Sequence, residues 1–197
     1  MKMLAAVILS GGASRRMGSP KALLPYQGRP FLEHLLEITR HPSIAARRVV
    51  LGADAEPIRK EISLTPEEIV VNEDWEKGQL SSLHAAMRSL PQGLGGLILC
   101  PVDHPLISAA LLDELIEAFT KTQALIVVPT FEGRRGHPVI FAAAVFGELF
   151  SASLETGARE VVWAHKGEIA EVPTNEEGCV LNLNDPDAFL KISGTRL

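Results

Sequence analysis

The sequence predicts an α/β fold built on a mostly parallel sheet. Short apolar runs alternate with stretches whose apolar residues recur at helical spacing, which is the pattern of βαβ units. The chain has 197 residues, and 46% of them are hydrophobic, so it can bury the core of one such domain. No repeat or linker is visible. We therefore expect residues 1–197 to form a single domain.

The first predicted strand, at residues 4–9, is continuously apolar, as expected of a strand that is buried on both faces. Ser81 and Ser82 are suited to capping the start of one of the predicted helices. In chain order, the later strands are expected at residues 48–52, 69–72, 97–101, 124–129, 138–141 and 169–172. The helices are expected at residues 30–39, 56–62, 81–89, 108–120, 143–150 and 186–192.

Composition limits the classes of partner. The formal net charge of −5 argues against a nucleic acid, which usually needs a basic face. The apolar run at 4–9 is too short to span a bilayer, and the glycine-rich turn after it is not a signal-peptide cleavage region. Cys100 and Cys179 show neither zinc-site nor redox spacing. We expect a cytoplasmic protein that binds small anions at local cationic loops.

The segment after the first strand combines glycines with cations. Gly11 and Gly12 let the backbone turn sharply and bring its N–H groups close to a ligand, while Arg15, Arg16 and Lys21 supply the positive charge that a triphosphate needs. The spacing is neither G-x-x-x-x-G-K-[ST] nor G-x-G-x-x-G. A turn with solvated surface cations would not need three of them together. The sequence therefore predicts a polyphosphate-binding loop of a third kind.

Asp103 is the second chemical feature, because it follows the apolar strand at 97–101. Ligands of open α/β sheets bind at the carboxyl ends of the strands, so Asp103 should lie near the glycine loop. A carboxylate there can hold Mg²⁺, which prefers hard oxygen ligands and bridges phosphates. A capping or turn role is the alternative. His104 is expected to be a neighbour and not a ligand, since imidazole suits softer metals.

Residues 10–21, S-G-G-A-S-R-R-M-G-S-P-K, resemble the L-x-G-G-x-S-x-R-M-G-x-x-K signature of the MobA-like nucleotidyltransferases. The resemblance implies a three-layer α/β/α Rossmann-like nucleotidyltransferase fold, in which this loop wraps the base and triphosphate of an NTP. Residues 78–83 resemble the family's G-x-x-S-S-L segment, which contacts base and ribose. The nucleotide-binding residues so implied are Leu9, Ser10, Gly11, Gly12, Arg15, Arg16, Met17, Gly18, Lys21, Gly78, Ser81 and Ser82.

The metal site implied by the resemblance has two parts. The P-V-D-H-P string is similar to the family's metal-binding motif and makes Asp103 the Mg²⁺ ligand. Near the C-terminus, N-L-N-D-P-D resembles D-I-D-T-P-E-D or N-I-N-T-P-E-D, with Asn182 and Asn184 on the acidic or amide positions. Asn184 could ligate the metal directly or through water, or Asp185 or Asp187 could be the working group. A helix cap before Pro186 is the alternative interpretation.

A basic turn at residues 132–141 carries two arginines and a histidine between glycines, which is suited to binding an anion, with Gly136 leaving room for a ligand. A plain basic hairpin would explain the glycines and arginines but not the G-H-P string. The segment resembles the R-G-H-P-V-x-F motif of the molybdenum cofactor cytidylyltransferase branch, and residues 157–159 resemble its G-A-R element. The acceptor-binding residues so implied are Arg134, Arg135, Gly136, His137 and Pro138.

The implied reaction transfers a nucleotidyl group from an NTP to an acceptor phosphate and releases pyrophosphate. Arg16 and Lys21 would neutralise the leaving pyrophosphate, and Mg²⁺ on Asp103 would polarise the α-phosphate. The R-G-H-P turn favours CTP as donor and molybdopterin as acceptor, with a molybdoenzyme as possible recipient of the product. The asparagine-rich C-terminal motif departs from the cytidylyltransferase pattern.

Three alternatives stay open. Two of them are enzymes: a GTP-dependent molybdenum cofactor guanylyltransferase and a sugar-phosphate nucleotidyltransferase. The third is a carrier or chaperone of the pterin cofactor. A carrier would keep the basic turn but would have no need of Asp103 together with the triphosphate loop. Oligomeric state is not set by the sequence.

Overall fold

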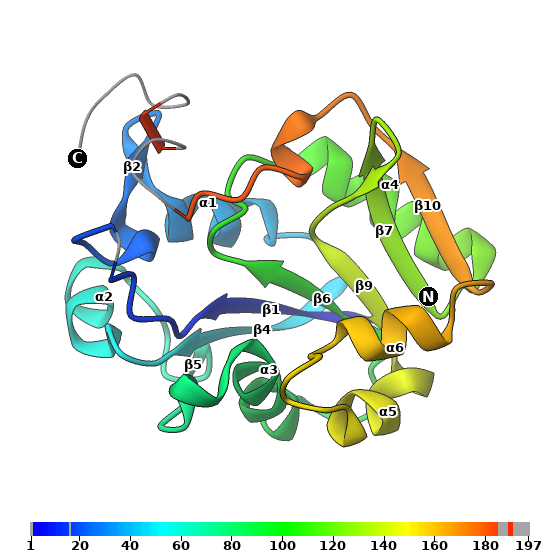
Figure 1. Cartoon of the computed structure of the whole chain (residues 1–197), viewed down its shortest axis with the longest axis horizontal. Coiled ribbons are helices and arrows are strands. Elements are labelled where there is room, and N and C mark those ends of the chain that lie inside the picture. The colour runs from blue at the N-terminus through cyan, green and yellow to red at the C-terminus, as the bar shows by residue number, and fades with distance from the viewer. Residues whose placement is uncertain (1, 16, 185–188, 191–197) are drawn as a thin grey trace.

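The computed structural model describes residues 2–15, 17–184 and 189–190, and its centre is one twisted sheet (Figure 1). The strand order is β10-β7-β9-β6-β1-β4-β5, with β8 paired to β7. The strands are β1 (Leu4–Ser10), β4 (Ile44–Leu51), β5 (Ile69–Val71), β6 (Gly96–Pro101), β7 (Ile126–Phe131), β8 (Arg134–Arg135), β9 (Val139–Ala142) and β10 (Ile169–Pro173). β8 and β9 run antiparallel to their neighbours, and every other pair is parallel. The expected mostly parallel sheet is confirmed.

Helices cover both faces of this sheet (Figure 1). One buried cluster joins the sheet to α1 (Phe31–Ile38), α2 (Ala55–Glu61) and α4 (Ala109–Thr122). The other joins it to α3 (Gln79–Arg88), α5 (Phe146–Ser151) and α6 (Arg159–Ala164). The three-layer α/β/α arrangement is therefore confirmed.

β1 shows why the sequence folds this way. All seven of its residues are buried, and its side chains alternate between the two clusters: Leu4 and Ile8 lie in one, while Val7 and Leu9 lie in the other. A strand in the middle of a parallel sheet has no solvent face, so it reads as a continuous apolar run.

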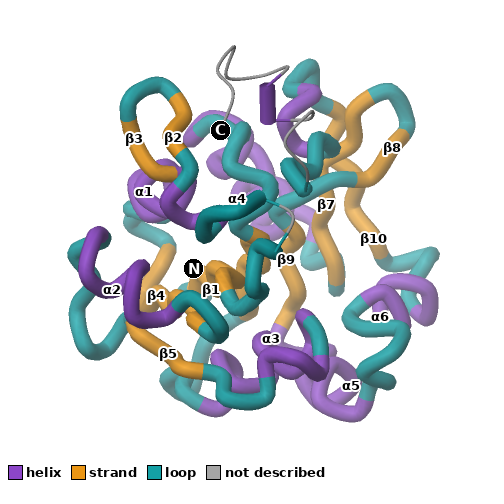
Figure 2. The backbone as a smooth tube through the Cα atoms, turned by 60° about the vertical axis from the view of Figure 1, so that its left-hand side comes forward, coloured by secondary structure: helices purple, strands orange, loops and turns teal. Residues whose placement is uncertain are grey.

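Short elements complete the fold. A hairpin of β2 (Pro25–Tyr26) and β3 (Arg29–Pro30) stands apart from the main sheet, next to α1 (Figure 2). Single 3-10 turns occur at η1 (Lys21–Leu23), η2 (Trp75–Lys77), η3 (Ala143–Val145) and η4 (Glu177–Cys179). The sequence did not predict the hairpin, β8 or α6, because segments of two to six residues are too short to show a period. Most of the helix expected at 186–192 lies outside the described residues.

The start of α3 differs from the prediction. The helix begins at Gln79, two residues before the serine pair, and Gly78 at φ 95° occupies the N-cap without a side-chain bond. Ser81 and Ser82 are buried in the first turn, so the expected capping by this pair is wrong. Glycine sets this helix start because it adopts a left-handed φ without strain. At α4, by contrast, the hydroxyl of Ser108 accepts the N–H of Leu111 at 3.0 Å and caps the helix.

The carboxyl ends of β1, β4 and β6 lie at one edge of the sheet, because β1 runs parallel to both neighbours. The loops that follow them approach closely: a Cβ at Gly52 would lie 2.3 Å from the carbonyl oxygen of Gly11. Ala53 donates its N–H to that same oxygen at 3.2 Å. Glycine at position 52 is thus what allows the loops after β1 and β4 to share this edge.

No helix among the described residues is long and apolar enough to cross a membrane.

His165 predicts a pH dependence of stability. Its ring nitrogens lie 2.8 Å from the carboxylates of Glu168 and Glu148, and these hydrogen bonds, Glu168 first, raise its pKa. A raised folded-state pKa stabilises the protein below the unfolded value of about 6.5, and the contribution is lost as pH rises through the folded value. We expect His165→Gln to lower the free energy of unfolding in urea at about pH 6 and to change it little at about pH 9. An equal loss at both pH values would contradict this.

Candidate active site

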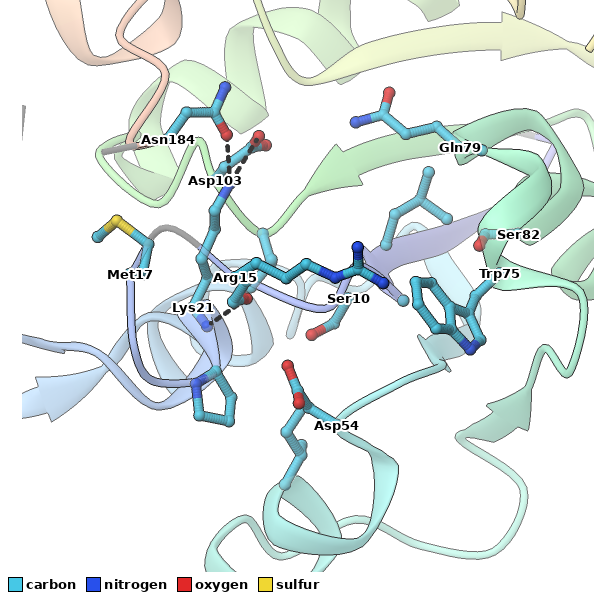
Figure 3. A pocket seen from close by; sticks show the side chains of 18 residues that line it. Ser10, Arg15, Met17, Lys21, Asp54, Trp75, Gln79, Ser82, Asp103 and Asn184 are labelled. Atoms are coloured by element: carbon cyan, nitrogen blue, oxygen red, sulfur yellow. Dashed lines mark hydrogen bonds and ion pairs between the residues drawn. The ribbon is translucent and has the colours of Figure 1, made fainter. Parts of the chain in front are cut away.

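A cavity of about 270 Å³ opens at the carboxyl edge of the sheet, among the loops after β1, β4 and β6 (Figure 3). It is lined by residues from five separate segments of the chain. Eleven of the residues singled out from the sequence line it: Leu9, Ser10, Gly11, Gly12, Arg15, Met17, Lys21, Gly78, Ser82, Asp103 and Asn184. The segments that resemble nucleotide- and metal-binding motifs therefore meet in one place.

Three predicted nucleotide-binding residues are not among the described residues that line the cavity. Arg16 lies outside the described residues. Gly18 does not line the cavity, and its φ of 66° serves the turn of the loop. Ser81 does not line it either, because its hydroxyl accepts the side-chain N–H of Asn72 at 2.9 Å and donates to the carbonyl of Gly78 at 2.8 Å. Ser81 thus holds the loop before α3 in shape.

Hydrogen bonds within the glycine loop stabilise its conformation. The hydroxyl of Ser14 accepts the backbone N–H of Lys21 at 3.0 Å, and its carbonyl accepts the N–H of Met17 at 2.8 Å. Met17 is 4% exposed and anchors the loop in the core. Arg15 extends over the cavity (Figure 3). Its guanidinium lies 4.0 Å from the carboxylate of Glu76. Hydrogen bonds within the loop and the burial of Met17 therefore hold the backbone that carries Lys21.

Lys21, Asp103 and Asn184 form a polar cluster at one end of the cavity (Figure 3). The ammonium of Lys21 lies 3.7 Å from Asp103 Oδ2 and donates a hydrogen bond to Asn184 Oδ1. Only 17% of the lysine side chain and 11% of the aspartate side chain are exposed, so solvent screens the pair weakly. The side-chain oxygens of Asp103 and Asn184 thus both face the ammonium of Lys21.

This oxygen pair fits a divalent cation. Mg²⁺ is commonly held by one or two protein oxygens and by substrate phosphates, and Lys21 already places a positive charge at that point. Among the described residues, no three His, Cys, Asp or Glu side chains come together as a metal cage. A metal here would therefore depend on phosphate oxygens to complete its ligands.

Asn184 reaches the cluster because the segment 176–184, which we call the strap, is fixed to the β6–α4 connection. The carboxylate of Glu176 accepts the backbone N–H of Ser108 at 2.9 Å. A Cβ at Gly178 would lie 1.7 Å from the carbonyl oxygen of Leu106, so only glycine fits there. The N–H of Leu183 donates to the carbonyl of Asp103 at 2.9 Å, which sets Asn184 beside that carboxylate.

The predicted acceptor-binding residues lie outside this cavity. Arg134 and Arg135 are exposed on β8, and Arg135 donates to the carboxylate of Glu171 at 2.8 Å. Gly136 does not leave room for a ligand: a Cβ there would lie 2.3 Å from the carbonyl oxygen of Cys179. Its role is to let the strap pack against the turn, and sequence alone could not show which neighbour needs the space.

His137 connects this turn to the polar cluster. Its ring centroid lies 4.7 Å from that of His104, next to Asp103, and its backbone N–H donates to the carbonyl of Cys179 at 2.8 Å. Burial lowers the pKa of His137 to about 3 and lowers that of His104 as well. Both rings are therefore neutral near pH 7. Pro138 follows in a buried position.

Seven residues that line the cavity were not singled out from the sequence: Ser14, Pro20, Asp54, Ile58, Trp75, Gln79 and Val102. Asp54 follows β4 at the same edge as Asp103 follows β6, so the rule that found Asp103 could also have found it. Trp75 and Gln79 flank Gly78 in the polar loop before α3 and carried no spacing signal.

Comparison with known proteins gives one family. The model described as "MobA-like NTP transferase domain" matches residues 6–169. A nicotine blue oxidoreductase from Paenarthrobacter nicotinovorans is 32% identical over 165 residues, 78% of either chain. A molybdenum cofactor guanylyltransferase from Shewanella sediminis is 26% identical over 193 residues, 95% of this chain and 94% of that one.

Solved structures agree with this fold. Rv0371c from Mycobacterium tuberculosis H37Rv superposes with a TM-score of 0.86, 28% identity and 98% coverage of both chains. A second crystal structure of that protein is described as a complex with manganese. It superposes with a TM-score of 0.82 and 26% identity, and the match covers 98% of this chain and 99% of that one.

The close contact at Gly178 predicts a loss of stability. Gly178→Ala should lower the free energy of unfolding by about 1–3 kcal/mol, the usual cost of overpacking, because the strap must move off Leu106. Gly167→Ala is the matched control, since a Cβ there meets nothing within 4 Å. Urea denaturation of both variants checks this; equal stability of the two would show that the strap is not held by this contact.

Proposed function

We propose that this chain, which belongs to the MobA-like NTP transferase family, moves a nucleotidyl group from an NTP onto a phosphorylated small-molecule acceptor and releases pyrophosphate. The observation that carries the proposal is the cluster of Lys21, Asp103 and Asn184 beside the glycine loop. A triphosphate needs cations, backbone N–H groups and metal-binding oxygens together, and this cavity offers all three.

In the proposed reaction, an oxygen of the acceptor phosphate attacks the α-phosphorus. The bond between the α-phosphorus and the bridging oxygen breaks, and pyrophosphate leaves with the electron pair. The acceptor phosphate is already an anion at neutral pH, so no protein base is needed. Lys21 neutralises the charge that grows on the leaving group, and Arg16 is proposed for the same task. Catalysis is then mainly positioning and electrostatics.

Asp103 and Asn184 would hold the metal, which we propose to be Mg²⁺. When bound, the ion would supply charge neutralisation and polarisation of the α-phosphate. The chain's own part is to hold the two oxygens in place: Asp103 by the end of β6, and Asn184 by the strap. Because a related structure is described as a manganese complex, Mn²⁺ belongs in every assay beside Mg²⁺.

We propose molybdopterin or the molybdenum cofactor as acceptor and CTP as the favoured donor, on the strength of the R-G-H-P turn. Arg134, Arg135 and His137 would meet the acceptor, with a molybdoenzyme as possible recipient. Relatives named molybdenum cofactor guanylyltransferases favour GTP as the alternative donor, and a sugar phosphate is the alternative acceptor. Residues 1–197 would act as one nucleotidyltransferase domain in the cytoplasm, where reduced thiols such as those of Cys100 and Cys179 are the rule.

The residues of the cavity argue against two other functions, those of an oxidoreductase and of a pterin carrier. One relative is named an oxidoreductase, but the glycine loop here lacks the G-x-G-x-x-G spacing of dinucleotide binders. A pterin carrier would not need Lys21, Asp103 and Asn184 beside a triphosphate loop. Nucleotidyl transfer is the function that uses all of these residues.

Pyrophosphate release tests the proposal directly. The protein is incubated with molybdopterin, Mg²⁺ or Mn²⁺, and CTP, GTP, ATP or UTP in parallel, while NADH and NADPH oxidation is followed in a separate arm. We expect release with CTP; release with GTP instead would assign the guanylyltransferase alternative. Nicotinamide oxidation without pyrophosphate release from any NTP would contradict nucleotidyl transfer.

Asp103→Asn tests the metal-binding role. The amide keeps the shape but removes the charge, so we expect kcat for pyrophosphate release to fall by about 10²–10³, as for loss of one strong transition-state contact. Asp113→Asn is the matched control, because Asp113 is an exposed carboxylate on α4 outside the cavity. A wild-type rate in Asp103→Asn would remove this carboxylate from the mechanism.

A further inference from the structure

Asp54 lines the cavity but has no task in the proposed chemistry. It comes from the connection between β4 and α2, and its carboxylate points into the cavity (Figure 3). Aspartate before a helix usually caps it, yet this side chain makes no capping hydrogen bond to α2. No hydrogen bond or ion pair joins its carboxylate to another residue that the structure describes. Burial also raises the pKa of its carboxyl, which a hydrogen bond from a ligand would offset.

The charge of Asp54 decides which part of an NTP can face it. A carboxylate repels the negatively charged triphosphate. The triphosphate is instead attracted to Lys21 and the other cations of the glycine loop. Asp54 must therefore face the uncharged nucleoside. The nucleoside has hydrogen-bond donors only on its ribose hydroxyls and on its base.

The cavity that Asp54 lines also presents an aromatic side chain, that of Trp75. Trp75 and Gln79 line it from η2 and the start of α3 (Figure 3). The base of the tryptophan side chain lies close to the loop after β4, since a Cβ at Gly52 would lie 2.7 Å from Trp75 Cβ. An indole supplies a stacking surface that accepts any base, because every base has a π face. Stacking alone cannot choose a base, so the choice falls to the polar groups at its edge.

We propose that Asp54 is the base-selecting residue of this site, and that its carboxylate accepts a hydrogen bond from the exocyclic amino group of the NTP base. This rests on the proposed function. Cytosine, guanine and adenine each carry such an amino group. Uracil carries the carbonyl oxygen O4 where cytosine carries its amino group, and this oxygen would face the carboxylate lone pairs and leave Asp54 without that hydrogen bond. The site therefore accepts its amino-bearing base and rejects UTP.

Asp54→Asn tests the proposal, because the amide keeps the shape and can donate to uracil O4. For wild type, we expect kcat/KM with UTP to be at least about tenfold below that with the best NTP, the discrimination expected from one half-buried group left unpaired. In Asp54→Asn, we expect the ratio of UTP to the best NTP to rise about tenfold or more. Glu61→Gln is the matched control: Glu61 is an exposed acid at the end of α2, the helix that Asp54 precedes, and lies outside the cavity, so its ratio should equal that of wild type.

Calorimetric titration with the four NTPs and Mg²⁺, without acceptor, separates this proposal from the proposed function. Preference for an amino-bearing base that is lost in Asp54→Asn supports the role of Asp54 even if pyrophosphate is never released. Wild-type binding of UTP as tight as that of the best NTP would overturn it. An equal loss of affinity for all four NTPs in Asp54→Asn would also overturn it and assign Asp54 to the ribose. Absence of binding by any NTP would overturn both proposals.

Discussion

The contact of Lys21 with Asp103 and Asn184 joins three segments that lie far apart in the chain: the glycine loop, the end of β6 and the strap. Hydrogen bonds to charged groups are stronger than neutral ones, and a half-buried ammonium without partners would be costly. The strap has no other described polar side chain at this end of the cavity. The shape of the site therefore depends on this contact.

Close backbone approaches make that contact reachable. Gly52 lets the loop after β4 lie against Gly11, and Gly178 lets the strap lie against Leu106. Gly136 does the same between the basic turn and Cys179, and so ties the predicted acceptor side to the strap that carries Asn184. The glycines of this protein thus serve two purposes: some shape the glycine loop, and others allow the elements around it to pack.

Strong patterns in the sequence were sufficient to predict much of this fold. β1 and β6 are continuously apolar because both faces are buried, and α4 begins at its capping serine, so these elements were predicted nearly as they occur. The edge rule for parallel strands correctly placed Asp103 beside the glycine loop. The role of Gly136 was misread because the space around a glycine depends on a segment distant in sequence. Asp54 was missed because it resembles an ordinary helix cap until the structure shows its side chain turned away from the helix.

The position of a bound metal tests the central claim most directly. Crystals of the protein with Mn²⁺ and an NTP analogue that cannot be cleaved between the α- and β-phosphates would be measured near the manganese absorption edge. The account predicts one anomalous peak within ligand distance of a side-chain oxygen of Asp103 or Asn184, about 2 Å away. A metal bound to the nucleotide but away from both side chains would contradict it.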